Sequence, residues 1–282
     1  MNLDEELGSW QGRTETLSDR VALQPVRGLA ALLDRKHEYR SGDELPLLAH
    51  WLYFLPAAHQ SELGDDGHPR RGGFLPPVTL PRRMWAGSRI EFHRTLRVGE
   101  EVSRTSRIAA VNSKQGRSGS LVFVRVTHEI RSGESLAITE EQDIVYRDVP
   151  QAGNVQTPTP APDQAVWRRE IVPDPVLLFR YSALTFNAHR IHYDRPYARE
   201  VEHYPGLVVH GPLMATLLLD LVYRSIPAAK VHRFSFRAVN PLFDVARFSV
   251  CGKHDAKEPG MLHLWAQDEA GMLALEAHAM LA

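Results

Sequence analysis

Cysteine is almost absent from the sequence: its 282 residues contain only Cys251, so no disulfide can form within the chain. This composition fits a reducing cytoplasm. Long hydrophobic runs are also missing, because no apolar stretch approaches the ~20 residues that a membrane span needs. The acidic N-terminus, residues 1–6, lacks the basic and apolar regions of a signal peptide. The net charge of −1 gives no overall attraction to nucleic acid or anionic membranes. We therefore expect a cytoplasmic protein that binds neither.

A proline-rich segment divides the chain into two nearly equal parts. Residues 148–165 contain four prolines among small and polar residues, which is typical of a semi-extended linker. The hydrophobic content of 43% and the charged content of 24% are those of a globular protein. We therefore predict an N-terminal domain over residues 1–147 and a C-terminal domain over residues 166–282.

The two parts repeat the same order of strand patterns. Alternating apolar and polar residues, rich in β-branched side chains, predict strands in both parts. The matched segments are residues 90–102 with 234–245, 121–130 with 261–268, and 135–139 with 272–276. Two copies of one strand order predict two similar domains that pack as a pair.

Each copy is also expected to contain a helix. Residues 212–225 are apolar on almost every face and begin at a Gly-Pro pair, which predicts a fully buried helix. In the first part, residues 45–55 are the best candidate. Residues 15–34 have apolar positions at roughly helical spacing and predict an additional amphipathic helix. An antiparallel sheet wrapped around a buried helix is the hot-dog fold, so the predicted class is α+β with a double hot-dog arrangement.

The most informative segment is residues 180–194, which is followed by Gly-Leu-Val-Val-His-Gly at 206–211. It resembles the active-site signature of the MaoC-like, R-specific enoyl-CoA hydratases, Ser/Thr-Gly-Asp-x-Asn-Pro-Ile/Leu-His followed by His-Gly. Residues at the signature positions are Thr185 for Ser/Thr, Asn187 for Asp, His189 for Asn, His192 for His, and Gly211 for the glycine of His-Gly. The departures are Phe186 for the first glycine, Asn187 for the acid and Arg190 for proline.

The sequence Phe-Asn-x-His-Arg-Ile-His-Tyr-Asp is similar to the corresponding motif of one subgroup of that family. The subgroup contains the type 2 hydroxyacyl-thioester dehydratases and the bacterial mesaconyl-C4-CoA and itaconyl-CoA hydratases. Segments 50–55, 73–77 and 80–87 of the first part resemble the same subgroup. The resemblance extends from about residue 45 to the end of the chain.

The resemblance implies hydration or dehydration of an acyl thioester. This reaction needs a base for water and hydrogen-bond donors for the enolate oxygen. Carried over by position, His192 is the base and acid, and the backbone amide of Gly211 is the oxyanion donor. Asn187 cannot exchange a proton near neutral pH, but its amide can orient water. His192 then performs both proton steps, which we favour, or shares them with His189, Asp194 or Tyr181.

Other interpretations of these residues stay open. The histidines could form a metal cluster, although no Cys and no His-Glu-x-x-His pattern supports one. We therefore expect neither a metal nor a cofactor. His192 could instead be an ordinary core histidine, and Asp194 is more typical of a turn or cap than of a proton donor. The residues of the possible metal cluster are His189, His192, His203 and His210, of which His210 is expected to be structural.

A pair of arginines in the first part, Arg82 and Arg83, precedes Trp85. Guanidinium groups make bidentate contacts with phosphates and carboxylates. The pair therefore suits the phosphates of CoA or the carboxylate of a dicarboxylic acyl group. The alternative is that the two arginines lie on a loop and contact only solvent. The loop at residues 72–77 is expected to line an acyl tunnel. The first part lacks a copy of the His192 motif, so it is expected to accommodate the substrate while the second part performs catalysis.

The leading prediction is an acyl-CoA hydratase or dehydratase, a hydro-lyase, that forms homodimers of double hot-dog chains. The resemblance favours reversible hydration of itaconyl-CoA or mesaconyl-C4-CoA to citramalyl-CoA. One alternative is a 3-hydroxyacyl-thioester dehydratase of fatty-acid synthesis. An alternative of another class is a hot-dog protein that only binds an acyl thioester, with Asn187 marking lost catalysis.

Overall fold

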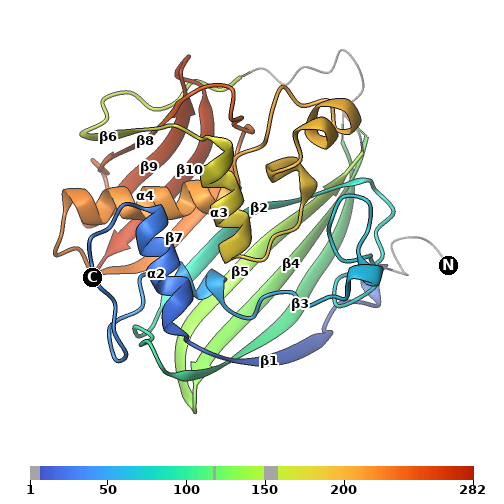
Figure 1. Ribbon diagram of the computed structural model, residues 1–282, viewed down its shortest axis with the longest axis horizontal. Helices are drawn as coiled ribbons and strands as arrows, with labels where there is room; N and C mark the ends of the chain where they lie inside the picture. The colour runs from blue at the N-terminus through green and yellow to red at the C-terminus, as the bar shows by residue number, and fades with distance from the viewer. Residues whose placement is uncertain (1–6, 117–118, 149–157) are drawn as a thin grey trace.

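A single ten-stranded antiparallel sheet spans both parts of the chain in the computed structural model, which describes residues 7–116, 119–148 and 158–282 (Figure 1). The strand order is β1-β3-β4-β5-β2-β7-β10-β9-β8-β6. The strands are β1 (Thr14–Arg20), β2 (Arg82–Phe92), β3 (Glu101–Gly116), β4 (Gly119–Ser132), β5 (Ser135–Arg147), β6 (Trp167–Ile171), β7 (Val231–Ala238), β8 (Phe248–His254), β9 (Met261–Asp268) and β10 (Leu273–Leu281). The first five come from the first part of the chain and the other five from the second, which confirms the predicted repeat of strands.

The two halves of the sheet are joined by the pairing of β2 with β7. The paired segment extends from Gly87 opposite Arg237 to Glu91 opposite Arg233. Glycine is required at position 87 because a Cβ there would lie 2.3 Å from the carbonyl oxygen of Phe236. The close approach of the two backbones makes one continuous sheet from the two copies.

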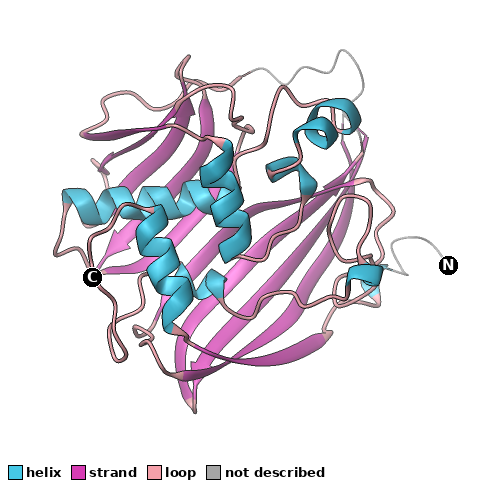
Figure 2. Ribbon diagram, viewed as in Figure 1, coloured by secondary structure: helices cyan, strands magenta, loops and turns pink. Residues whose placement is uncertain are grey.

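The helices lie on the same side of this sheet (Figure 2). Helix α4 (Gly211–Ser225) packs against β8, β9 and β10, and its residues from Leu213 to Val222 are all buried. The buried helix predicted for residues 212–225 is therefore confirmed. Helix α2 (Leu23–Leu32) packs against α3 (Pro175–Leu184). This contact connects the two parts of the chain. Within the described residues, no helix is long and apolar enough to cross a membrane.

One helix prediction in the first part is wrong, and another is correct only in part. Residues 45–55 contain only the 3-10 turn η1 (Ala49–Leu52), because Leu48 and Phe54 on either side have left-handed φ values of 66° and 54°. Residues 15–34 divide into strand β1 and helix α2, since the alternating residues of β1 pair with β3. The first part therefore has no long helix comparable to α4 in its described residues.

Half of the predicted linker, residues 149–157, lies outside the described residues. The described remainder is attached to the second part of the chain. Pro160 forms an isolated bridge with Met272, and the amide of Ala161 donates to the carbonyl of Gly271 at 2.9 Å. These contacts extend the β9–β10 turn rather than leaving residues 160 and 161 unpaired.

A buried carboxylate, Glu140, connects η1 to the sheet. It is 2% exposed and accepts hydrogen bonds from Nε2 of His50 at 3.1 Å, Nε1 of Trp51 at 3.1 Å and Oγ of Ser88 at 2.8 Å. Burial alone would raise the pKa of Glu140, but the hydrogen bonds and the charge of His50 outweigh burial and lower the pKa to about 2. Glu140 therefore stabilises the folded state in its ionised form.

We expect Glu140→Ala to lower the free energy of unfolding by about 3–5 kcal/mol, because its three donors would lose their buried acceptor. The folded-state pKa is depressed, so the stabilisation is present above pH 4.5 and is lost as the pH falls toward about 2. Urea denaturation of the wild type and the variant at several pH values measures both effects. Glu134→Ala, in the exposed turn before β5, is the control, and equal stability of the two variants would contradict this role.

Candidate active site

A cavity of about 930 Å³ lies between the first half of the sheet and the motif of the second part. Its size suits an acyl chain with part of a carrier group. It forms where the first copy lacks a long central helix, so the inner face of β3, β4 and β5 remains open. Its walls include the 72–76 loop, the 185–192 segment and the start of α4. The cavity thus brings together both halves of the predicted site.

The motif segment begins where helix α3 ends. Phe186 has a left-handed φ of 47°, which terminates the helix, and the amide of Asn187 then donates to Ser182 at 2.8 Å. Oδ1 of Asn187 accepts a hydrogen bond from the amide of His189 at 3.0 Å. This hydrogen bond occupies the side-chain oxygen of Asn187, so its NH2 group remains as the part that can donate to a bound molecule. A short 3-10 turn, η3 (Arg190–His192), then leads to the second histidine.

His192 has the arrangement of a general base. Its side chain is 8% exposed, and Nδ1 lies 2.7 Å from the carbonyl oxygen of Val208. Because a carbonyl only accepts, Nδ1 carries the proton and Nε2 keeps its lone pair. Burial lowers the pKa of His192 to about 4, despite the opposing hydrogen bond to Val208. His192 is therefore neutral near pH 7 and able to accept a proton from water.

His210 packs against the ring of His192. The two rings stack with centroids 3.7 Å apart and planes inclined by 18°. Nε2 of His210 lies 2.9 Å from Oγ of Ser182, and burial holds its pKa well below the usual range. This packing matches the structural role expected for His210. Tyr181 lies edge-on to His210 at 5.1 Å, and burial raises its pKa, so its hydroxyl stays protonated.

Gly211 is the first residue of α4 and lines the cavity. The first amides of a helix have no acceptor within the helix and lie at the positive end of its dipole. A Cβ built on Gly211 meets no atom within 4 Å, so the backbone here is open to the cavity. Both properties suit the stabilisation of an enolate oxygen.

The two predicted arginines differ in their surroundings. Arg82 is paired with Glu202 at 3.2 Å and lies 5.2 Å from the ring of Tyr204. Both arginines line the cavity, but Arg83 makes no ion pair with any carboxylate in the described part of the chain. Trp85 also lines the cavity, where its Nε1 donates to Ser88 at 3.0 Å.

Asp194 lies in a cap and not beside His192. Its Oδ1 accepts from the amide of Tyr197 at 3.2 Å, and its Oδ2 pairs with Arg190 at 2.8 Å. The capping interpretation therefore agrees with these contacts. Arg190 also donates to the carbonyl of Asp65, 3.0 Å away in the first part.

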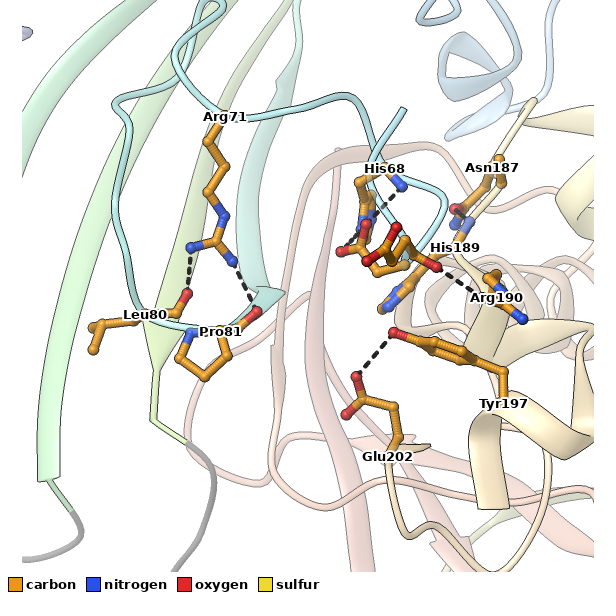
Figure 3. A network of polar contacts seen from close by, with 12 residues as sticks. His68, Arg71, Leu80, Pro81, Asn187, His189, Arg190, Tyr197 and Glu202 are labelled. Atoms are coloured by element: carbon orange, nitrogen blue, oxygen red, sulfur yellow. Dashed lines mark hydrogen bonds and ion pairs between the residues drawn. The ribbon is translucent and has the colours of Figure 1, made fainter. Parts of the chain in front are cut away.

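Two residues next to the motif were missed by the sequence analysis. His68 of the first part lies beside His189 with ring centroids 4.1 Å apart (Figure 3). Oδ2 of Asp66 lies 3.0 Å from Nδ1 of His68. The only signal was a polar turn, Asp-Asp-Gly-His at 65–68, next to the loop already predicted to line the cavity. Among the histidines of the predicted metal alternative, His189 has ligand atoms within 4.8 Å of Asp66 and His68, whereas His203 is exposed.

Solved structures place the chain among double hot-dog proteins, as the predicted fold class requires. A MaoC-like dehydratase aligns over 97% of this chain and 99% of its own, with a TM-score of 0.70 and 18% identity. HtdX of Mycobacterium tuberculosis aligns over 96% and 100%, with a TM-score of 0.65 and 22% identity. Another M. tuberculosis protein, described as having a double hotdog fold, covers 96% of each chain with a TM-score of 0.57 and 14% identity. At these identities the likeness establishes the fold.

The fold and the site together define a hydro-lyase that acts on acyl thioesters. The family described as hydroxyacyl-thioester dehydratase type 2 matches residues 48–244, and the chain belongs to this family. The chain is 49% identical over 273 residues to a mesaconyl-C(4)-CoA hydratase of Chloroflexus aurantiacus, covering 95% of each protein. It is 29% identical over 228 residues to the mitochondrial hydroxyacyl-thioester dehydratase type 2 of Schizosaccharomyces pombe, covering 72% of this chain and 75% of that protein.

We expect Asn187→Ala to lower kcat by about 10²-fold with little change in KM, because the amide positions water and not the substrate. Asn187→Asp should retain part of the activity, since a carboxylate can keep the turn with His189 and bind water. Steady-state kinetics of both variants test this role, with Asn112→Ala on the exposed part of β3 as the control. A folded but inactive Asp variant would mean that the NH2 group makes an essential donor contact.

Proposed function

We propose that the enzyme hydrates a C5 dicarboxylyl-CoA, mesaconyl-C4-CoA or itaconyl-CoA, to citramalyl-CoA. The observation that carries this proposal is the 49% identity with the C. aurantiacus mesaconyl-C(4)-CoA hydratase over 95% of both chains. An alignment of this extent spans the loops of the first part as well as the motif of the second. The cavity between those two regions is consistent with a substrate that contacts both.

In the proposed reaction with mesaconyl-C4-CoA, Nε2 of His192 takes a proton from water as the water oxygen bonds to the β-carbon. The electrons of the double bond move toward the thioester, and the amide of Gly211 stabilises the resulting enolate oxygen. A proton then bonds to the α-carbon and completes the addition. Asn187 orients the water, and the buried, neutral state of His192 supports its role as the base.

The free carboxylate of the substrate determines where a cation is needed. In mesaconyl-C4-CoA this carboxylate is bonded to the β-carbon, which must lie beside His192. Burying the charge without a partner would be costly, and arginine suits a carboxylate well. We assign this contact to Arg83, because Arg82 is already paired with Glu202. Trp85 is proposed to pack against the substrate beside it.

We further propose a division of labour between the two domains, residues 1–147 and 166–282. The first holds the acyl group with Arg83 and the 72–77 loop, and the second supplies His192, Asn187 and Gly211. We also propose that the protein forms a homodimer and works in the cytoplasm. The single cysteine, Cys251, is buried and compatible with a reducing compartment. Light scattering of the purified protein tests the dimer.

The family description and the S. pombe relative favour a second candidate, dehydration of ordinary 3-hydroxyacyl thioesters. The test is incubation of the enzyme with mesaconyl-C4-CoA, itaconyl-CoA and crotonyl-CoA, followed by mass spectrometry for the gain of one water. The proposal predicts a much higher kcat/KM for a dicarboxylyl thioester than for crotonyl-CoA. The reverse preference would support the second candidate, and binding of all three without turnover would indicate a non-catalytic thioester-binding protein.

A further inference from the structure

A loop of the first part docks directly onto the catalytic segment. The amide of Arg190 donates to the carbonyl of Asp66 at 2.9 Å, and its side chain reaches the carbonyl of Asp65. Gly67 has a φ of +87°, and a Cβ on it would lie 1.9 Å from the carbonyl oxygen of Ala188. Only glycine allows this approach, so the backbone fixes the position of the following residue, His68.

The side chain of His68 is held by both oxygens of Asp66. Oδ2 lies 3.0 Å from Nδ1 of His68, and Oδ1 accepts from its amide at 2.9 Å. The carboxylate accepts a hydrogen bond from the N–H at Nδ1. Nε2 is therefore the atom of His68 that can exchange a proton with a bound molecule. A histidine oriented by a carboxylate is an arrangement that suits acid–base catalysis.

His68 is the first of four histidine rings in a row. The centroid separations are 4.1 Å from His68 to His189, 5.5 Å from His189 to His192 and 3.7 Å from His192 to His210. Figure 3 shows His68 beside His189, with the two side chains coming from different parts of the chain. His68 is the member of the row that has a carboxylate partner among the described residues.

The reaction requires two proton transfers, one from water and one to the α-carbon. Asn187 cannot supply the second transfer, and His192 has only Nε2 available because Nδ1 is bound to Val208. We propose that His68, oriented by Asp66, is the second proton-transfer residue of the site. This inference rests on the proposed function, which needs a proton donor for the α-carbon.

The step starts with His68 protonated on both ring nitrogens. His192 gains the proton of the attacking water while His68 gives its Nε2 proton to the α-carbon and becomes neutral. One C–O bond and one C–H bond form as the C–C double bond and one O–H bond of water break. Solvent exchange then returns the proton from His192 to His68. In dehydration the roles reverse, with His68 as the base and His192 as the acid.

The groups around His68 act on its pKa in opposite directions, and the net result is a pKa below the usual value of histidine. Burial lowers its pKa, but the hydrogen bond to Asp66 opposes that effect, while the positive charges of Arg71 and Arg83 add to the lowering. Burial lowers the pKa of His189 to about 2, and His192 reaches about 4. The carboxylate of a dicarboxylyl substrate near Arg83 would favour protonated His68 further.

The test compares His68→Gln and Asp66→Asn with the wild type, using His37→Gln, an exposed histidine of the same part, as the control. We expect His68→Gln to lower kcat by about 10²-fold with KM nearly unchanged. The kcat of the wild type should fall on the alkaline side as His68 deprotonates, and this limb should be absent from His68→Gln. Asp66→Asn should keep the limb but move it to lower pH, because the loss of the anion lowers the pKa of His68.

Several results would overturn the proton role of His68. Activity of folded His68→Gln within about threefold of the wild type would leave both proton steps to His192. Loss of wild-type activity on chelation, with recovery on adding Zn²⁺, would instead make Asp66, His68 and His189 a metal site. Failure of the wild type to hydrate dicarboxylyl thioesters concerns the proposed function alone. The same pH profiles, measured with whichever thioester the wild type converts, then decide the role of His68.

Discussion

Replacing His192 by alanine is expected to lower kcat for hydration by about 10²–10⁴-fold without unfolding the protein, the range typical of a lost general base. The contacts of His192 define its chemistry, because Val208 holds the Nδ1 proton and leaves Nε2 as the basic atom. His210 stacks on the ring and fixes its plane, so the base is aligned before substrate binds.

Steady-state kinetics and circular dichroism of His192→Ala measure the effect, with His203→Ala, an exposed histidine, as the control. The wild type should also lose activity in acid. Since burial lowers the pKa of His192 to about 4, the neutral base is present above that pH and is protonated below it. Activity of the variant within about threefold of the wild type would remove His192 from the mechanism.

Replacing Arg83 by methionine is expected to lower kcat/KM for mesaconyl-C4-CoA by about 10²-fold, because a buried carboxylate would lose its cation. The loss should appear mainly in KM. Crotonyl-CoA has no carboxylate on its β-carbon and should be converted nearly as well as by the wild type. The ratio of kcat/KM for the two substrates is therefore the informative quantity.

Arg82→Met is the matched comparison, since Arg82 is the neighbouring arginine and is neutralised by Glu202. Its substrate ratio should change much less than that of Arg83→Met. Equal losses on both substrates in Arg83→Met would mean that Arg83 holds the CoA group. If neither variant lowers kcat/KM for mesaconyl-C4-CoA, the substrate would instead be assigned as a monocarboxylyl thioester.

The strands and the central helix were predictable because each is encoded by local patterns. Buried positions in β4 alternate with half-buried or exposed ones, and α4 is apolar all round because it lies inside. The resemblance to the MaoC-like signature assigned catalytic roles to His192, Asn187 and Gly211, and all three line the cavity. Each of these elements is determined by the residues of a single segment.

The errors came from segments whose conformation depends on distant partners. Residues 14–20 have enough apolar positions for an amphipathic helix, but pairing with β3 makes them a strand. Residues 45–55 are interrupted by left-handed Leu48 and Phe54, which no periodicity reveals. His68 is 124 positions before His192, and their proximity depends on how the first part docks onto the second.

The central claim is that His192-activated water adds to an unsaturated dicarboxylyl thioester. The most direct measurement is incubation of mesaconyl-C4-CoA with the wild type and with His192→Ala in ¹⁸O-labelled water, followed by mass spectrometry of the product. The wild type is expected to form citramalyl-CoA with one labelled hydroxyl oxygen on the β-carbon, while His192→Ala forms almost none. Unchanged thioester with the wild type, or equal labelling by both proteins, would contradict this role of His192.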